Sequence, residues 1–137
     1  MGRVVGRGPT TLGFDRLRWI ALVRRGEIHV VNLEPVKPGE ANKRRPGVIV
    51  SNDGANVAAE RSGQGVITVV PVTSNISRVY PFQVLLPAKL TGLEHDSKAQ
   101  AEQVRSISVE RLGNAIGEVP QGLMVELDEA LRLHLAL

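Results

Sequence analysis

The pattern of apolar and polar residues predicts a chain built mainly from short β-strands. Apolar residues alternate with polar ones or run together in short stretches bounded by turn-forming residues, which is typical of strands that end in turns. The predicted strands are residues 27–33, 48–51, 66–73, 82–86, 98–107 and 115–119. The stretch 66–73 is the most apolar, so we expect it to be buried on both faces, and Pro71 predicts that pairing ends nearby. Residues 52–56 predict a turn, followed by a helical turn at 57–61.

A stripe of leucines predicts a helix near the end of the chain. Pro120 suits the first helical position. After it, apolar side chains recur at helical spacing; they are Leu123, Met124, Leu127, Leu131 and Leu135. We expect this stripe to pack in the core or against a second subunit. Several short strands and one helix predict a mainly β fold with a C-terminal helix, arranged as a small β-barrel.

The length of 137 residues predicts one domain. Residues 1–22 show neither strand nor helix periodicity, so we interpret them as an N-terminal extension, either a flexible tail or a segment upstream of a true start at Val23. The domain is then 23–137. There is no cysteine, which excludes disulfides and thiolate metal sites. No apolar run reaches the roughly 18 residues that a membrane span needs, so we expect a cytoplasmic protein without membrane contact.

The formal charge of +3 comes from the first residues of the chain. Residues 1–22 hold four of the 17 basic and one of the 14 acidic side chains, which leaves 13 of each in the remainder. Net charge is therefore no argument for nucleic-acid binding. Placement is a better one, because the segment 37–45 carries four cations and only Glu40 as an anion. Such a local asymmetry is consistent with an anion-binding face, although charge alone favours a solvated loop before a strand.

Two short segments offer the chemistry of phosphate binding. Arg45 precedes Pro46, which favours an extended backbone at Arg45, and a guanidinium can grip two phosphate oxygens. Thr73 and Ser74 follow the strand 66–73 and could supply hydroxyls, or could simply form a turn. RNA can be cleaved without a metal, because its 2′-hydroxyl is an internal nucleophile. Such a site needs a cation, phosphate-positioning groups, a proton acceptor and a proton donor.

Other site chemistries find little support in the sequence. The three histidines have no metal-ligand spacing and the carboxylates do not cluster, so we expect no metal and no cofactor. Aromatic residues make up 3% of the chain. We consider that too few for a sheet that stacks bases.

Several short motifs, taken in order, resemble those of the MazF/PemK endoribonuclease toxins. The resemblance covers the chain from Val23 onward. The matching segments are 25–28, 33–35, 39–40, 45–46, 50–52, 72–74, 102–107 and Val119-Pro120, with Asp128 in the helix that follows.

This resemblance implies an SH3-like β-barrel that forms a homodimer and cuts single-stranded RNA at selected sequences. It further implies cleavage without a metal, leaving a 2′,3′-cyclic phosphate and a 5′-hydroxyl. A cognate MazE-like antitoxin is expected to block the RNA groove with an acidic and apolar tail. The class of RNA that is cut is left open.

By match to the family motifs, Arg45 and Thr73 take the catalytic positions, and Glu40 and Glu102 are candidates for general acid–base catalysis. The residues expected to bind RNA are Lys43, Arg44, Ser74, Asn75, Gln103 and Arg105. Water is a third candidate for the proton acceptor.

The chain departs from the family pattern at three positions. Gly39 and Gln100 stand where some relatives have a histidine and an arginine. His29 stands where an aromatic residue is common, which is expected to alter base stacking nearby.

Two other functions belong to the same fold class. A CcdB-like gyrase poison would need a Trp-Gly-Ile C-terminus, but this chain ends in His134-Leu135-Ala136-Leu137. A non-catalytic barrel that only binds an antitoxin would have no need of both Arg45 and Thr73.

Overall fold

The computed structural model of the protein describes residues 23–33 and 44–137. Within them lie seven strands, which are β1 (Glu27–Asn32), β2 (Arg44–Ile49), β3 (Val66–Thr73), β4 (Gln83–Leu86), β5 (Ser97–Gln100), β6 (Arg105–Ser108) and β7 (Leu112–Glu118). The helices are α2 (Asp53–Ser62), α3 (Ala88–Thr91) and α4 (Gln121–Leu135), with 3₁₀ turns at Ala101–Gln103 and Val109–Arg111. The predictions for residues 1–22, Gly39, Glu40 and Lys43 lie outside the described residues.

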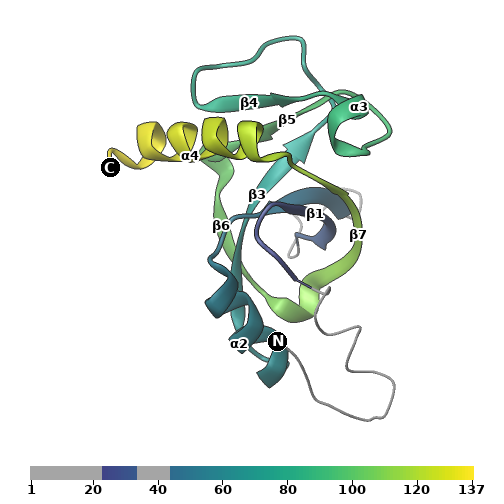
Figure 1. The fold of residues 1–137 in the computed structure, drawn as a ribbon, viewed down its shortest axis with the longest axis vertical. Coiled ribbons are helices and arrows are strands. Elements are labelled where there is room, and N and C mark those ends of the chain that lie inside the picture. The colour runs from purple at the N-terminus through teal and green to yellow at the C-terminus, as the bar shows by residue number, and fades with distance from the viewer. Residues whose placement is uncertain (1–22, 34–43) are drawn as a thin grey trace, which may run out of the picture.

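The strands form one antiparallel sheet that curls on itself. Their order is β4-β5-β3-β2-β1-β7, and β6 pairs with β3 beside this path. Figure 1 shows β7 bending around β1, while α4 crosses the molecule on the side of β4 and β5. In the described part of the chain β4 and β7 remain the two ends of the order, so the sheet is barrel-like but not closed. The prediction of a mainly β fold with a C-terminal helix is confirmed.

The predicted strand 98–107 is wrong, because two strands and a 3₁₀ turn occupy that segment. β5 pairs with Val72 and Thr73, whereas β6 pairs with residues 66–69 of the same strand β3. The chain has to step from one pairing to the other between them. It does so at Ala101–Gln103, where the N–H of Val104 donates to the Ala101 carbonyl at 3.1 Å. Tertiary pairing therefore overrides the local alternation.

The predicted turn at 52–56 is also wrong, because these residues begin α2. Asn52 has an extended backbone and its Oδ1 accepts the N–H of Ala55 at 2.8 Å. Asparagine is a good helix N-cap for this reason, as well as a good turn residue. Asn56 in the first turn is fully buried and donates to the Ser51 carbonyl at 3.0 Å. The helix ends at Gly63, which has a φ of 71°.

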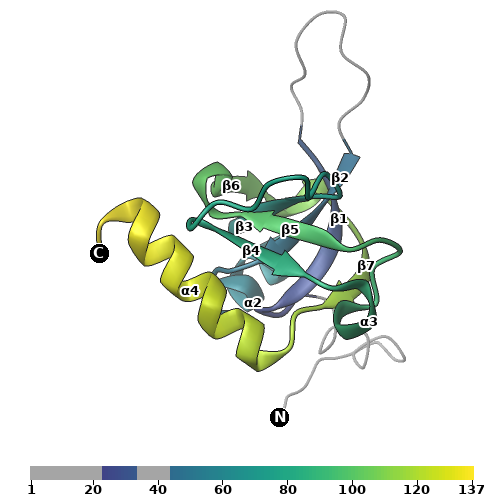
Figure 2. The ribbon, with the colours of Figure 1, turned by 90° about the horizontal axis from the view of Figure 1, so that it is seen from above.

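The core lies in two clusters on either side of the sheet. One cluster joins the sheet to α4 and includes Ile28, Val70 and Leu127, all fully buried. The other lies between the sheet and α2, around Ile49 and Val69. Figure 2 shows α4 lying across the sheet with its C-terminal end projecting beyond it.

The strand 66–73 and the leucine stripe behave largely as expected. Of strand β3, the side chains from Val69 to Val72 are buried on both faces. The same prediction for the whole of 66–73 is wrong at its start, because Val66 is 58% exposed. Met124 and Leu127 are buried, and Leu123 and Leu131 are partly buried against the first cluster, but Leu135 is 49% exposed. The stripe therefore belongs to the core over most of its length and leaves it near the end of α4.

Arg25 fastens the start of β1 to two helices. Its Nη2 lies 2.6 Å from Asp128 Oδ1 on α4, its Nε donates to the Val50 carbonyl at 2.9 Å, and its backbone N–H donates to Asp53 Oδ1 at 2.7 Å. His29 has a related role between strands. It is buried, and its ring nitrogens lie 3.1 Å from the Gly113 carbonyl and 3.0 Å from Glu27 Oε1. A ring so enclosed is not available to stack on a base; the expected change in base stacking near this position stays a prediction.

Candidate active site

The strands β2 and β3 separate at the positions where the predicted catalytic residues lie. Their register pairs Ile49 with Val69, Val48 with Val70 and Gly47 with Pro71, and pairing stops there. The same register, continued by two residues on each strand, brings Arg45 opposite Thr73. Residues opposite each other in an antiparallel pair present their side chains on one face. The fold therefore brings together two residues that lie 28 positions apart in the chain.

Pro46 explains why the ladder ends at this point, and Pro71 does not disturb it. In an antiparallel pair every second residue exchanges hydrogen bonds, and the Val50 N–H bonds the Thr68 carbonyl at 2.9 Å. The bonded pairs that follow in register are Val48 with Val70, and then Pro46 with Val72. Pro46 has no N–H to donate, so that pair is incomplete. Pro71 also lacks a backbone N–H. It lies between the stretches of β3 that pair with β6 and with β5, so no neighbouring strand needs that donor.

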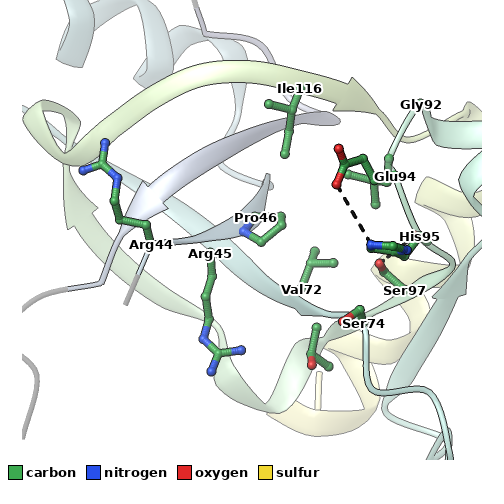
Figure 3. A pocket seen from close by; sticks show the side chains of 12 residues that line it. Arg44, Arg45, Pro46, Val72, Ser74, Gly92, Glu94, His95, Ser97 and Ile116 are labelled. Atoms are coloured by element: carbon green, nitrogen blue, oxygen red, sulfur yellow. Dashed lines mark hydrogen bonds and ion pairs between the residues drawn. The ribbon is translucent and has the colours of Figure 1, made fainter. Parts of the chain in front are cut away.

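A cleft of about 600 Å³ opens where the strands part. Its walls come from β2, the end of β3, the segment 92–97 and β7, and the lining residues are Arg44, Arg45, Pro46, Val72, Thr73, Ser74, Gly92, Leu93, Glu94, His95, Ser97 and Ile116. Figure 3 shows Arg44 and Arg45 on one side of the cleft, with Glu94, His95 and Ser97 on the other. Four predicted site residues, Arg45, Thr73, Arg44 and Ser74, are thus brought together.

The two central side chains differ in how they are held. Within the described residues the Arg45 guanidinium has no hydrogen bond or ion pair, so it is available to an anion. Thr73 Oγ1 accepts the N–H of Asn75 at 3.2 Å, which orients the hydroxyl and leaves its hydrogen free to be donated. The Asn75 side chain is itself engaged, because its Oδ1 accepts from the N–H and the Oγ of Ser77. Asn75 therefore shapes the loop and does not line the cleft.

Three further predicted residues lie away from the cleft lining. Glu102 is half-buried; its Oε2 accepts from Gln83 Nε2 at 2.7 Å, and its buried Oε1 has no hydrogen-bond partner among the described residues. Gln103 lies on the 3₁₀ turn that follows β5, and Arg105 is exposed on β6, opposite Val69. None of these three residues is among those that line the cleft.

The segment 93–97, predicted as a plain connector, supplies one wall of the cleft. Asp96 Oδ1 fixes it to α3 by accepting the Ala88 N–H at 2.8 Å, and Ser97 Oγ donates to the His95 carbonyl at 2.9 Å. The His95 side chain is 74% exposed, with Nε2 4.0 Å from Glu94 Oε1. Imidazole is the side chain that most readily exchanges a proton near neutral pH. The run of polar residues from Glu94 to Ser97 was the signal in the sequence.

The described residues offer no obvious place for a metal or a membrane span. In residues 23–33 and 44–137, no three histidine, aspartate or glutamate side chains gather as ligands would. No helix in these ranges is long and apolar enough to cross a bilayer.

Comparison with known proteins agrees with the geometry of this cleft. A family model described as PemK-like, MazF-like toxin of type II toxin–antitoxin systems matches residues 24–135. The endoribonuclease MazF9 of Mycobacterium tuberculosis is 62% identical over 85% of this chain and 98% of its own length. The endoribonuclease EndoA of Bacillus subtilis is 32% identical over 85% and 97%.

Solved structures give the same result. A chain in the crystal structure of MazE–MazF from Deinococcus radiodurans superposes with a TM-score of 0.63 and 26% identity, over 85% of this chain and 97% of that one. The matched region contains both strands that form the cleft and the whole segment 92–97. The chain belongs to the PemK/MazF family of toxins of type II toxin–antitoxin systems.

Proposed function

We propose that the protein is an endoribonuclease that cleaves single-stranded RNA in the cleft between β2 and β3 without a metal ion. The observation that carries this proposal is that Arg45 and Thr73 line one open cleft, just beyond the last paired residues of β2 and β3. Two relatives that span the same part of the chain are named endoribonucleases. The cleft joins a cation to two hydroxyls, which are the groups that a phosphate needs.

The reaction uses the 2′-hydroxyl of the RNA as nucleophile. Its oxygen bonds to the adjacent phosphorus as its proton leaves, the bond from phosphorus to the 5′-oxygen breaks, and that oxygen takes up a proton. The products are a 2′,3′-cyclic phosphate and a 5′-hydroxyl. Arg45 binds the phosphate oxygens as negative charge builds on them, and the hydroxyls of Thr73 and Ser74 donate to the same group. Arg44 and Lys43 attract the RNA backbone.

The proton acceptor has several candidates. Glu40 and Glu102 hold family positions, and bulk water is a third. Glu102 does not line the cleft, and its Oε2 is held by the amide of Gln83 while its Oε1 is buried. His95 already lines the cleft, and an imidazole both accepts and donates protons near neutral pH. We include His95 among the candidates for this reason.

The experiment for cleavage uses purified protein and a mixed single-stranded RNA in excess EDTA. We expect discrete fragments whose 5′ ends are labelled by a polynucleotide kinase without prior phosphatase treatment, since a 5′-hydroxyl is the group that the kinase accepts. Cleavage that strictly requires Mg²⁺, or an absence of cleavage by the folded protein, would contradict the proposal. No effect on DNA supercoiling by gyrase is expected, and inhibition there would favour the CcdB-like alternative.

We also propose that the protein acts as a cytoplasmic homodimer that a MazE-like antitoxin neutralises. A structure of MazE–MazF from Deinococcus radiodurans supports the second part, and the unpaired cations of the cleft suit an acidic tail. For the dimer, Val125 and Leu133 on α4 are more than half exposed, which is typical of apolar side chains that contact a partner. Light scattering during gel filtration should give twice the mass of the chain; a monomer at micromolar concentration would contradict the dimer.

A further inference from the structure

The loop that follows Thr73 carries a stacked pair of aromatic rings. Tyr80 and Phe82 lie parallel, with 5.4 Å between ring centroids and 1° between ring planes. Tyr80 is 41% exposed, so part of its ring remains open to solvent. Half of the four aromatic residues of the chain are in this pair. A low aromatic content therefore conceals a local aromatic surface.

Two cations accompany the pair. The guanidinium carbon of Arg78 lies 5.6 Å from the centroid of the Tyr80 ring, and Arg78 Nη1 donates to the Tyr80 hydroxyl at 3.1 Å. Lys98 Nζ lies 5.8 Å from the same centroid and donates to the Arg78 carbonyl. Cations at this distance are attracted to an aromatic face. The surface thus combines rings that can stack on a base with charges that suit a phosphate.

This surface, which we call the Tyr80 platform and define as Arg78, Tyr80, Phe82 and Lys98, adjoins the cleft. Lys98 on β5 is the direct strand partner of Thr73 on β3. Opposed residues of an antiparallel pair have Cβ atoms roughly 5 Å apart on the same face. Thr73 and Lys98 are therefore neighbours across the two strands, and the Lys98 side chain lies over the Tyr80 ring.

The platform is held in place by a residue assigned above to acid–base chemistry. Gln83 accepts the Tyr80 N–H at 3.1 Å through its Oε1, and its own N–H donates to the Tyr80 carbonyl at 2.9 Å. Gln83 Nε2 in turn donates to Glu102 Oε2 at 2.7 Å. Glu102 therefore acts on the loop through Gln83, as a positioning residue for Tyr80. Such support fixes the ring before any ligand arrives.

We infer that the Tyr80 platform is a nucleotide subsite for a base next to the scissile phosphate. The base stacks on the Tyr80–Phe82 pair, and the exposed Arg78 contacts its phosphate, while the buried Lys98 supports the loop through the Arg78 carbonyl. This inference rests on the proposed function and names the part of the surface that holds the RNA strand beyond the cleft. Stacking accepts every base, because each has a π face. The platform thus contributes affinity and alignment, whereas the choice of sequence belongs to other contacts.

The test measures binding and cleavage separately. Binding is measured by fluorescence anisotropy with an oligonucleotide that carries 2′-deoxyribose at the cut site, and cleavage with the matching all-ribose strand. Tyr80→Ala should weaken binding and raise KM about tenfold, in line with the loss of one base stack, with kcat changed less than twofold. Tyr80→Phe should restore most of the binding. Val79→Ala, at a neighbouring residue that is 42% exposed, should leave KM unchanged.

A second measurement locates the base that stacks. One abasic nucleotide is placed in turn at each position of the deoxy-substituted strand. Wild-type protein should lose about tenfold in affinity at one position, and Tyr80→Ala should show no further loss there. Equal losses in both proteins at every position, or unchanged binding by Tyr80→Ala, would overturn the inference. If the wild type does not cleave the all-ribose strand, the proposed function fails on its own account.

A third measurement needs no variant, in case Tyr80→Ala does not fold. Wild-type protein is irradiated with strands that carry 5-iodouridine next to the cut site, and cross-linked peptides are identified by mass spectrometry. The peptide that contains Tyr80 and Phe82 should carry the label. Cross-links confined to other peptides, or a dimer in which a partner subunit covers Tyr80, would contradict the subsite.

Discussion

Arg25 and Arg45 carry the same side chain but lie in opposite surroundings. Arg25 bonds the carboxylate of Asp128, the carbonyl of Val50 and, through its backbone, the carboxylate of Asp53. Arg45 lines the cleft, and within the described residues its guanidinium has no protein partner. Both belong to short motifs shared with the family. One joins three elements of the fold, and the other is left for a ligand.

Two arginines in short motifs of the same kind can therefore have different roles, one in the fold and one in ligand binding. An arginine whose donors are used by the protein stabilises the fold, and its loss affects unfolding before it affects chemistry. An arginine without protein partners adds little to stability and gives its full charge to an incoming phosphate. The sequence alone does not show which arginine is structural and which is available to a ligand, because the partners of Arg25 lie far along the chain. Substitution of each arginine tests whether the two roles are distinct.

The largest effect is expected for Arg45→Ala. Without the cation that stabilises the charged phosphate, kcat for RNA cleavage should fall by about 100-fold or more. The free energy of unfolding in urea should change by less than about 1 kcal/mol. Arg61→Ala removes an exposed arginine on α2 and serves as the matched control, with no expected effect on kcat. A stable Arg45→Ala protein with normal kcat would contradict the assignment.

Thr73→Val tests the residue opposite Arg45. The change keeps the shape of the side chain and removes the hydroxyl that would donate to the phosphate, so kcat should fall about tenfold. Thr73→Ser keeps the hydroxyl and should recover most of the rate. Steady-state cleavage assays report both effects. A normal kcat in Thr73→Val, with a loss confined to Thr73→Ser, would mean that the methyl group, and not the hydroxyl, is what matters.

Arg25→Ala should have the reverse profile of Arg45→Ala. We expect the free energy of unfolding to fall by about 1–2 kcal/mol, because hydrogen bonds to Asp128 and Val50 are lost, while kcat per folded molecule stays near the wild-type value. Asp128→Ala should lose less, because the pair is one-third exposed and exposed pairs contribute under about 1 kcal/mol. An Arg25→Ala protein that is fully stable but inactive would abolish the distinction.

Glu60 extends the comparison to a carboxylate without a cationic partner among the described residues. Burial, and secondarily the charge of Glu27, raise the pKa of Glu60 from 4.5 to about 7. Between these values the folded state binds more protons than the unfolded one, so stability should fall as pH rises from 4.5 to 7 and level off above. Urea unfolding across this range measures the slope. Glu60→Gln should flatten it, and Glu126→Gln on the exposed face of α4 should not.

The sequence predicted several of the residues that line the cleft, but it did not predict how they are arranged in space. Arg45 and Thr73 were identified from motifs, but their proximity in the fold depends on how β2 pairs with β3. No local sequence pattern predicts that pairing. Glu102, Gln103 and Arg105 follow the same family match, yet none of them lines the cleft, and Arg105 lies on β6 opposite Val69. His95 was missed because 50 residues separate it from Arg45 and only the fold brings both to the lining of one cleft.

The helix α2 illustrates a different limit. Asn52, Asp53 and Gly54 suit a turn and a helix start equally well, since asparagine serves both. The choice is made by burial of Asn56 beneath the sheet, a contact with residues outside the local window. In contrast, the strands 27–33 and 66–73 and the terminal helix were predicted well, because each buries a face whose periodicity is visible in the sequence.

The incomplete pair of Pro46 and Val72 has a consequence for how RNA would enter. Clefts are often closed in the free protein by segments that must be displaced, at a cost in affinity. Here β2 and β3 cannot form the complete hydrogen-bonded pair of Pro46 and Val72, because proline has no backbone N–H to donate. Replacing Pro46 with alanine would supply that donor and allow one more rung to form, narrowing the entrance. Among the described residues, the five-membered ring of Pro46 therefore keeps the ends of β2 and β3 from completing this pair whether or not a ligand is present.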